Sequence, residues 1–342
     1  MDPFDVITML TAINNTPRPK TFLLNLLFGG RVKTFTTAEV MVDFTKGKRR
    51  MAPFVSPYIG GKLMEREGRS VRTYRPPLIQ PRDVLTPERL NTRMAGENLQ
   101  SALSPADRLA KEQADILDMF DQYITRREEW MAAQLLFTGA IRMVGEGVDE
   151  NFSVSFSNTD TLSNADLWSA STANPIGDIN SWRRTVQEKS GITPNAAVMS
   201  SDVADAFLNH PNVKDMLDVR RMEMGTINPS ELPNGATYLG SLAREGMDLY
   251  EYNEWYVDDA TGLSKPMIPA TYLALVPTAD RNPGAQMLYG AWTEMVKKTT
   301  YEGARIPRVW SEEGPNATFI EVVSRPLPLM PDADSWFVAK VL

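Results

Sequence analysis

The sequence predicts an α+β fold, and three patterns along the chain carry that prediction. One stretch in the first half has the periodicity of a single very long helix. The second half mixes helix and strand patterns, and a basic, proline-rich segment precedes the long helix. With 342 residues the chain can bury a large core, and no segment repeats at a fixed period.

The long helix is predicted from Pro105 to Thr138. Ser104 is a favourable N-cap, Pro105 suits the first helical position, and Gly139 stops the helix. Its 34 residues would span about 50 Å, whereas a mean helix has only about 11–12 residues. Such an element either crosses an ordinary domain or forms the rigid spine of an elongated molecule. The apolar residues at helical spacing are Leu109, Ile116, Leu117, Phe120, Ile124, Met131 and Leu135.

The remaining elements are shorter. In the N-terminal part, the sequence predicts a short helix in TFLLNLLFGG that ends at Gly29 and Gly30, then one strand in VKTFTTAEVMVDF. In the second half it predicts a helix in SWRRTVQEKSG that stops at Gly191 and a buried strand in NAAVMS. A further helix is capped by Ser201 or Asp202. Strands follow in MDLYEYNEWY, TYLALVP, NATFIEVVSRPLPLM and SWFVAKVL.

The basic segment reads PYIGGKLMEREGRSVRTYRPP over residues 57–77, and it predicts two extended arms about a Glu67–Gly68 tip. From Lys46 to Arg93 there are twelve Lys and Arg against four Asp and Glu, while the net charge of the chain is −7. Its prolines exclude a central strand, and an isolated two-stranded ribbon is marginal in water, so the ribbon needs an external surface. That surface is the acidic body of another copy or a nucleic acid; a solvated loop is the third interpretation.

Little in the sequence favours catalysis or metal binding. There is no cysteine, and the one histidine, His210, precedes Pro211 and is predicted to be structural. Glu128 and Glu129 are adjacent on the long helix, so they do not share a face as paired catalytic carboxylates would. Residues 258–262 indicate a hairpin turn rather than a calcium loop. We therefore predict no active site, no cofactor and no metal, and no apolar run is long enough to span a membrane.

An ordered set of segments resembles the major capsid protein E family of lambda-like tailed bacteriophages. The set begins with GKRRMAPFVSPYIGGKLMEREG and PPLIQPRDVLTPERL, continues through RREEWMAAQLLFTG, SWRRTVQEKSGITPNAAVMSSDVADAFL, ATYLGSL and YNEWYVDD, and ends with SRPLPLMPDADSWFVAKVL. The resemblance runs nearly end to end and in the same order.

This resemblance implies the Hong Kong 97-type capsid fold. Its parts would be an N-terminal arm (1–45), an extended loop (46–95), a peripheral domain (96–185 and 291–325) with the spine helix 105–138, and an axial domain (186–290 and 326–342). The implied function is that of a major capsid protein, which self-assembles into pentamers and hexamers of an icosahedral shell around double-stranded DNA. Such a protein is not an enzyme.

Inter-subunit contacts are expected from the extended loop, with aromatic anchors and arginines that face an acidic neighbour: Phe54, Tyr58, Arg66, Arg69, Arg72 and Arg75. The resemblance also implies a separate scaffolding protein, a portal, a decoration protein, and packaged DNA that is contacted weakly and without sequence preference. Assembly in the bacterial host cytoplasm and a final place in the virion follow, with no membrane partner.

Three alternatives remain open on the sequence. The same fold could form the shell of a cellular nanocompartment or of a gene-transfer particle. A carboxylate-based enzyme would require a pocket with convergent carboxylates of perturbed pKa. A basic-armed nucleic-acid-binding protein would lose affinity steeply with salt.

Overall fold

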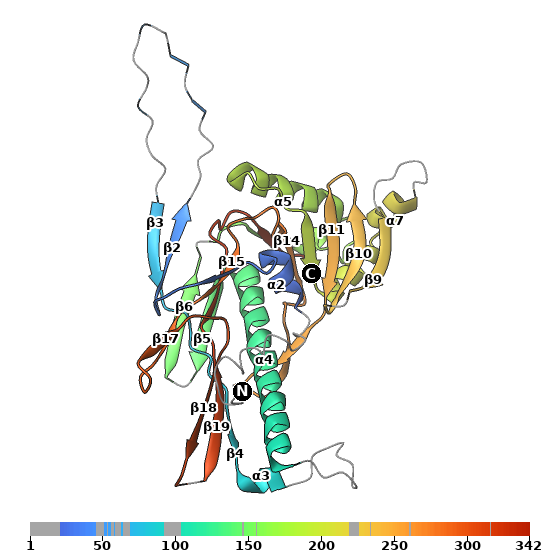
Figure 1. Ribbon diagram of the computed structural model, residues 1–342. Coiled ribbons are helices and arrows are strands. Elements are labelled where there is room, and N and C mark those ends of the chain that lie inside the picture. The colour runs from blue at the N-terminus through green and yellow to red at the C-terminus, as the bar shows by residue number, and fades with distance from the viewer. Residues whose placement is uncertain are drawn as a thin grey trace.

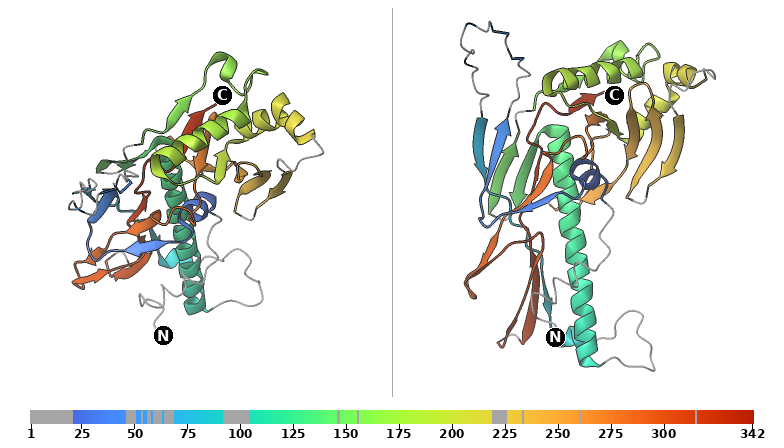
Figure 2. Two further views of the ribbon diagram at one scale, coloured as in Figure 1. Left: turned by 90° about the horizontal axis from the view of Figure 1, so that it is seen from above. Right: turned by 45° about the horizontal axis from the view of Figure 1, so that its top comes forward.

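A computed structural model places one long helix, α4 (Pro105–Thr138), at the centre of the molecule, with sheets on both sides of it (Figures 1 and 2). The structure describes residues 21–45, 51–52, 54–55, 58, 63, 69–91, 104–145, 147–154, 156–218, 226–232, 234–259, 261–314 and 316–342. Helix and strand are mixed, as the sequence predicts.

The bounds of α4 are those predicted from its sequence. The Ser104 hydroxyl accepts a hydrogen bond from the backbone N–H of Asp107 at 3.2 Å, which is the N-cap interaction. At the other end, Gly139 adopts φ +67°, and its N–H donates to the carbonyl of Leu135 at 3.0 Å. A Cβ at position 139 would lie 2.6 Å from Cβ of Phe156, so this position requires glycine for space as well as for conformation.

Helix α4 contributes to two separate cores. Its first half packs Ile116, Phe120 and Ile124 against a three-stranded sheet of order β18–β19–β4. Its second half, from Met131 onward, packs into a larger core that includes Trp336, whose indole N–H donates to the carbonyl of Leu136 at 3.0 Å. The strands of the small sheet are β4 (Arg82–Leu85), β18 (Ile306–Glu312) and β19 (Ala317–Val323).

The largest sheet has seven strands in the order β7–β21–β14–β8–β11–β10–β9. A third core lies between this sheet and the helices α5 and α6. Its elements are β7 (Thr159–Thr161), β21 (Phe337–Lys340), β14 (Tyr272–Val276), β8 (Ala196–Met199), β11 (Met247–Tyr252), β10 (Ala236–Leu242), β9 (Thr226–Glu231), α5 (Pro175–Ser190), α6 (Ser201–Asn209) and α7 (Pro211–Asp218).

Sequence predictions in this region are confirmed in part, since the single strand predicted in MDLYEYNEWY is two strands in different sheets, β11 and β12 (Trp255–Val257). Helix α5 ends at Gly191, and NAAVMS forms the fully buried strand β8. The cap of α6 is Ser200 rather than Ser201 or Asp202, because the Ser200 hydroxyl accepts from the N–H of Val203. His210 is buried, and its Nε2 lies 3.1 Å from the carbonyl oxygen of Ala170, as expected for a structural histidine.

The N-terminal residues that the structure describes pack on the chain's own core. Helix α2 (Phe22–Phe28) is present as predicted, and it buries Phe22, Leu23, Leu27 and Phe28. The single strand predicted in VKTFTTAEVMVDF is instead two strands with different partners. β1 (Val32–Thr34) joins the sheet β1–β15–β20 with β15 (Gln286–Tyr289) and β20 (Pro326–Leu329), whereas β2 (Val40–Thr45) leaves the body.

The ribbon is built differently from the prediction. We expected residues 57–77 to fold on themselves about Glu67–Gly68, and this was wrong. β3 (Arg69–Tyr74) pairs with β2, from Val40 opposite Tyr74 to Thr45 opposite Arg69. The strand that follows, β4, is not part of the ribbon but an edge strand beside β19. Figure 1 shows the β2–β3 ribbon projecting away from the body.

Three short hairpins and two short helices complete the described elements. The predicted turn at residues 258–262 connects β12 and β13, and Gly262 adopts φ +66° there. The elements are β5 (Ala140–Gly145) with β6 (Val148–Ser153), β12 (Trp255–Val257) with β13 (Ser264–Pro266), β16 (Trp292–Glu294) with β17 (Thr299–Tyr301), the helix α3 (Pro87–Asn91) and the 3-10 helix η1 (Asn164–Asp166).

Candidate functional site

The buried charges of the described chain serve to join elements. Arg305 reaches α4 through three hydrogen-bonded partners. Its Nε donates to Asp121 Oδ1 at 2.7 Å, and its two terminal nitrogens donate to Glu128 at 2.7 and 3.0 Å and to the hydroxyl of Thr125 at 2.9 Å. The hydroxyl of Tyr289 donates to the same Glu128 at 3.0 Å. Burial lowers the pKa of Arg305, but its attraction to Glu128 and Asp121 outweighs that effect, so the net pKa is raised and the charge is retained.

Glu129, the next residue on α4, holds the start of α2. Its two carboxylate oxygens accept from the N–H groups of Leu23 and Leu24 at 2.7 and 3.1 Å, and Oε1 also accepts from the hydroxyl of Tyr252 at 2.9 Å. Burial raises the pKa of Glu129, although these hydrogen bonds oppose the shift. Both glutamates are thus structural. They bind different partners because adjacent residues of a helix face different directions.

The described residues contain little that resembles a catalytic or metal centre. No group of three or more His, Cys, Asp or Glu side chains that could hold a metal occurs in the described part of the chain. The carboxyls with raised pKa there are Glu129 and Asp178, and both are engaged in structural hydrogen bonds, Asp178 with the indole N–H of Trp168 at 3.0 Å. Within the same described ranges, no helix is both long and apolar enough to cross a membrane.

The β2–β3 ribbon is attached to the body through its root. Val40 and Val42 are buried there, and the ring of Tyr74 packs edge-on against Phe152 with 4.6 Å between ring centroids. Gly290 is packed closely against this root, because a Cβ on it would lie 3.3 Å from the carbonyl oxygen of Ala38. The root of the ribbon is therefore packed against the body of the same chain.

Beyond the root, the described apolar side chains face solvent. Phe54 is fully exposed and Tyr58 is 95% exposed, and their role as anchors against another molecule stays a prediction. Sequence reasoning missed three further residues of the same kind, Met41, Met51 and Leu63, which are 73%, 85% and 96% exposed. Their signal was available, since each is an apolar residue inside a segment that cannot form a core of its own.

The structure describes the predicted arginines to different extents. Arg75 is exposed at the root, and the backbones of Arg69 and Arg72 lie in β3, opposite Thr45 and Val42. The side chains of Arg69 and Arg72 and the whole of Arg66 lie outside what the structure describes.

One arginine that sequence reasoning missed lies near Arg75. Arg325 has a buried Nε atom without a hydrogen-bond partner, and burial together with the charge of Arg75 lowers its pKa. The root of the ribbon thus carries two positive charges close together.

The segment that follows the ribbon is held by a second ionic cluster. Glu321 is fully buried on β19, and its carboxylate accepts from Gln80 at 2.9 Å, from Arg82 at 3.1 Å and from Arg308 at 3.1 Å. The guanidinium of Arg308 also lies 4.5 Å from the ring centroid of Trp310. The chain that leaves the ribbon is therefore anchored twice, by Tyr74 at the end of β3 and by Glu321 at the start of β4.

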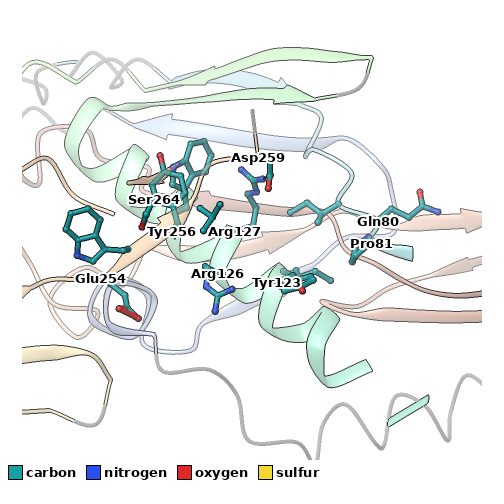
Figure 3. Close-up of a pocket in the computed structure, with 14 residues that line it drawn as sticks. Gln80, Pro81, Tyr123, Arg126, Arg127, Glu254, Tyr256, Asp259 and Ser264 are labelled. Carbon is teal, nitrogen blue, oxygen red and sulfur yellow. The ribbon is translucent and has the colours of Figure 1, made fainter. Parts of the chain in front are cut away.

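A hollow lies beside α4. Its volume is about 720 Å³, and it opens between the helix and the β12–β13 hairpin (Figure 3). Arg126 and Arg127 stand on its helical side, and Glu254 and Asp259 stand on the hairpin side. Tyr123, Trp130, Trp255 and Tyr256 line the hollow together with these charged side chains, so its surface is mixed in character.

The sequence matches a known protein family and several of its members. The model of the family described as phage major capsid protein E matches residues 5–341. The chain is 27% identical over 329 residues to the P21 prophage-derived major head protein of Escherichia coli O6:H1 strain CFT073, with 92% of each chain covered. It is also 27% identical to the major capsid protein of Escherichia phage lambda over 318 residues, covering 88% of this chain and 89% of the other.

Solved structures show the same fold. A crystal structure of a prophage protein from E. coli CFT073 superposes with a TM-score of 0.73 at 18% identity, and 99% of each chain is covered. A phage-related protein from Bordetella bronchiseptica RB50 gives a TM-score of 0.57 at 12% identity, with 98% of this chain and 97% of that chain covered. Because the family model spans nearly the whole sequence, the chain belongs to the phage major capsid protein E family.

Proposed function

We propose that this chain is the major capsid protein of a lambda-like tailed phage, and that its copies form the pentamers and hexamers of an icosahedral head. The observation that carries the proposal is the β2–β3 ribbon, which leaves the body and presents Phe54, Tyr58 and Leu63 to solvent. A monomer gains nothing from such a ribbon, because exposed apolar side chains cost free energy. Against a neighbouring copy the same side chains would be buried.

The expected strength of assembly comes from apolar burial rather than from charge. Ion pairs at the rim of an interface contribute only about 0–1 kcal/mol each. Burying an apolar side chain such as Phe54 contributes about 1.5–3 kcal/mol. The arginines of the ribbon would instead select the orientation of the neighbour, whose surface is acidic on average because the residues outside 46–93 carry a net charge of −15. A heterologous contact repeated about an axis closes a ring, as a capsomer requires.

The division into parts remains part of this proposal. Residues 46–95 would act as the extended loop, the α4-centred region as the peripheral domain, and the seven-stranded sheet as the axial domain. The separate cores of the small and the large sheet support such a division. The arm would be shorter than residues 1–45, since Phe22–Phe28 is buried on the same chain.

The partners and the location follow from the same proposal. We ascribe to the chain a separate scaffolding protein, a portal and a decoration protein, and a weak, sequence-independent contact with packaged DNA. Assembly would take place in the host cytoplasm, and the finished protein would reside in the virion. We ascribe no enzymatic role to it, because its buried carboxylates are engaged in structural contacts. The match to a phage capsid family favours this assignment over a cellular nanocompartment.

The proposal is tested by removing the apolar anchors of the ribbon. In the double variant F54S/Y58S, made with the scaffolding gene co-expressed, we expect few or no shells by negative-stain microscopy and a shift to small species in sedimentation velocity. Charge reversal in R69E/R72E should impair assembly as well. The far-ultraviolet circular dichroism of each variant should match the parent chain, because Phe54 and Tyr58 are exposed and Arg69 and Arg72 belong to β3 of the projecting ribbon.

The matched control is V144S, which changes a 68% exposed apolar residue on the β5–β6 hairpin, outside the ribbon. Shells at parental yield are expected from it. Normal shells from F54S/Y58S would remove the ribbon from the assembly contacts.

A further inference from the structure

The tip of the β16–β17 hairpin presents two adjacent large apolar side chains to solvent. Met295 is 81% exposed and Val296 is 80% exposed. Lys297 and Lys298 follow them and are exposed as well, and Lys298 adopts φ +52° in the turn. Adjacent exposed apolar side chains on a projecting turn are of the kind that marks an interaction site.

The hairpin below this tip is packed by its own chain. Trp292 and Tyr301, which are directly opposite each other, stack with 6.4 Å between ring centroids. Arg308 Nε donates to Glu294 at 3.2 Å, and the same guanidinium lies 5.8 Å from the ring centroid of Trp292. The tip is therefore held in place before any partner arrives, and little ordering entropy would be lost when it binds.

The hairpin and α4 lie on opposite faces of the β18–β19–β4 sheet. On β19, Ile320 packs into the core shared with α4, so the next residue, Glu321, faces away from that helix. Arg308 bonds both to Glu321 and to Glu294 of the hairpin, which attaches the hairpin to the face away from α4. Figures 1 and 2 show this arrangement. The tip can therefore meet the hollow beside α4 only when the hollow belongs to another copy.

The hollow has a mixed lining that suits such a tip. Its volume of about 720 Å³ lies in the range of about 300–1,000 Å³ that is typical of ligand pockets. Trp255 and Tyr123 stand in it with 53% and 52% of their surfaces exposed. A thioether packs favourably against aromatic rings, so Met295 suits this part of the lining. The wall formed by α4 consists of Tyr123, Ile124, Arg126, Arg127 and Trp130.

The charges of the hollow define how the tip would enter it. Arg127 is neutralised by its ion pair with Asp259 of the facing hairpin. Glu254, on that hairpin side, is exposed and forms no ion pair with another residue of the described chain, and the same holds for Lys298 at the tip. Arg126 stands on the helical side and would repel a lysine, so Lys298 must enter beside Glu254 (Figure 3).

We propose that the β16–β17 tip of one copy docks into the hollow beside α4 of a neighbouring copy, with Met295 and Val296 against the aromatic side chains and Lys298 beside Glu254. The contact joins two different surfaces, so its repetition about an axis can close a ring. It rests on the proposed function, because the copies must meet in a shell, and it adds a contact between bodies to the contact of the ribbon.

The chain has no cysteine, so two introduced cysteines can be joined selectively. In V296C/V257C, one cysteine lies at the tip and the other lines the hollow. Shells of this variant, made with the scaffolding gene co-expressed and treated with a short bis-thiol cross-linker, should give a ladder of dimers, trimers and larger species on denaturing gels. V296C or V257C alone should remain monomeric there. The matched control V144C/V257C, with the first cysteine on the exposed β5–β6 hairpin, should give no ladder.

The proposed ion pair is tested in the same V296C/V257C background. K298E places two carboxylates together and E254K places two ammonium groups together, so each should lower the initial rate of cross-linking by up to about fivefold. The combined change K298E/E254K restores opposite charges and should recover most of the rate.

Three results would overturn the proposal. Normal shells of V296C/V257C without a ladder would show that the tip and the hollow do not meet, and would leave the proposed function intact. An equal ladder from V144C/V257C would show that the contact is not specific to the tip. A ladder from Y58C/V257C and none from V296C/V257C would assign the hollow to the ribbon of the neighbour. If the parent chain itself forms no shell, the proposed function fails, and the same cross-linking in concentrated solution still decides the contact.

Discussion

The α4-centred body and the β2–β3 ribbon differ in which side chains they bury. In the body, even charged groups are buried and satisfied by the same chain: Arg305 is 10% exposed and bonds to Asp121, Thr125 and Glu128. In the ribbon, even apolar groups are exposed, with Leu63 at 96%. This contrast supports the proposal that stability and assembly depend on different parts of the sequence. Substitutions in the two parts should therefore have separable effects.

The largest effect on stability is expected from R305A. The substitution leaves Glu128 and Asp121 buried without their cation, and such a loss costs about 3–5 kcal/mol of unfolding free energy. Chemical denaturation monitored by circular dichroism measures it. The control R142A removes an exposed ion pair with Asp149 and should leave the transition midpoint unchanged. Equal stability of R305A and the parent would show that the network does not hold α4 to the body.

A smaller and pH-dependent effect is expected from E129Q. The glutamine cannot accept all three hydrogen bonds, so near neutral pH the loss should be about 1–3 kcal/mol of unfolding free energy. Burial raises the pKa of Glu129 above its ordinary value of 4.5, so the folded chain keeps this proton to higher pH than the unfolded chain does. The parent should therefore lose stability as pH rises from about 4.5, through the raised pKa. E129Q should lack this slope when denaturation midpoints are compared from pH 4 to 7.

The smallest effect on the monomer is expected from L63S in the ribbon. Because Leu63 is almost fully exposed, its unfolding free energy should stay within about 0.5 kcal/mol of the parent. The same variant should give fewer shells than the parent under assembly conditions. A clear loss of monomer stability would contradict the separation of the two regions.

The parts that the sequence predicted well are those whose signals are local. The spine helix was placed to the residue because Ser104, Pro105 and Gly139 act on their immediate neighbours. The end of α5 at Gly191 and the hairpin turn at residues 258–262 were also predicted from local signals, although α5 begins at Pro175, six residues before the predicted segment. The fold family was predicted from an ordered resemblance rather than from these signals, and the family model confirms it.

The errors concern partners far apart in the chain. Turn signals at Glu67–Gly68 suggested a local hairpin, but β3 found its partner in residues 40–45, which no local pattern could identify. The burial of α2 was missed for the same reason, since it depends on Glu129, more than 100 residues away. Phe54 and Tyr58 were chosen as candidate contacts from the composition of their segment, and that role stays a prediction. Arg325 could not be found in this way, because only folding brings it near Arg75.

The shared helix has a consequence for how the molecule loses its structure. α4 supplies Phe120 to the core of the small sheet and Leu136 to the larger core, and both lie on one continuous hydrogen-bonded rod. Melting either core would strip one half of that rod of its packing, and a helix in water without packing is marginal. On heating, the two cores should therefore fail together in one transition, even though no strand is common to both.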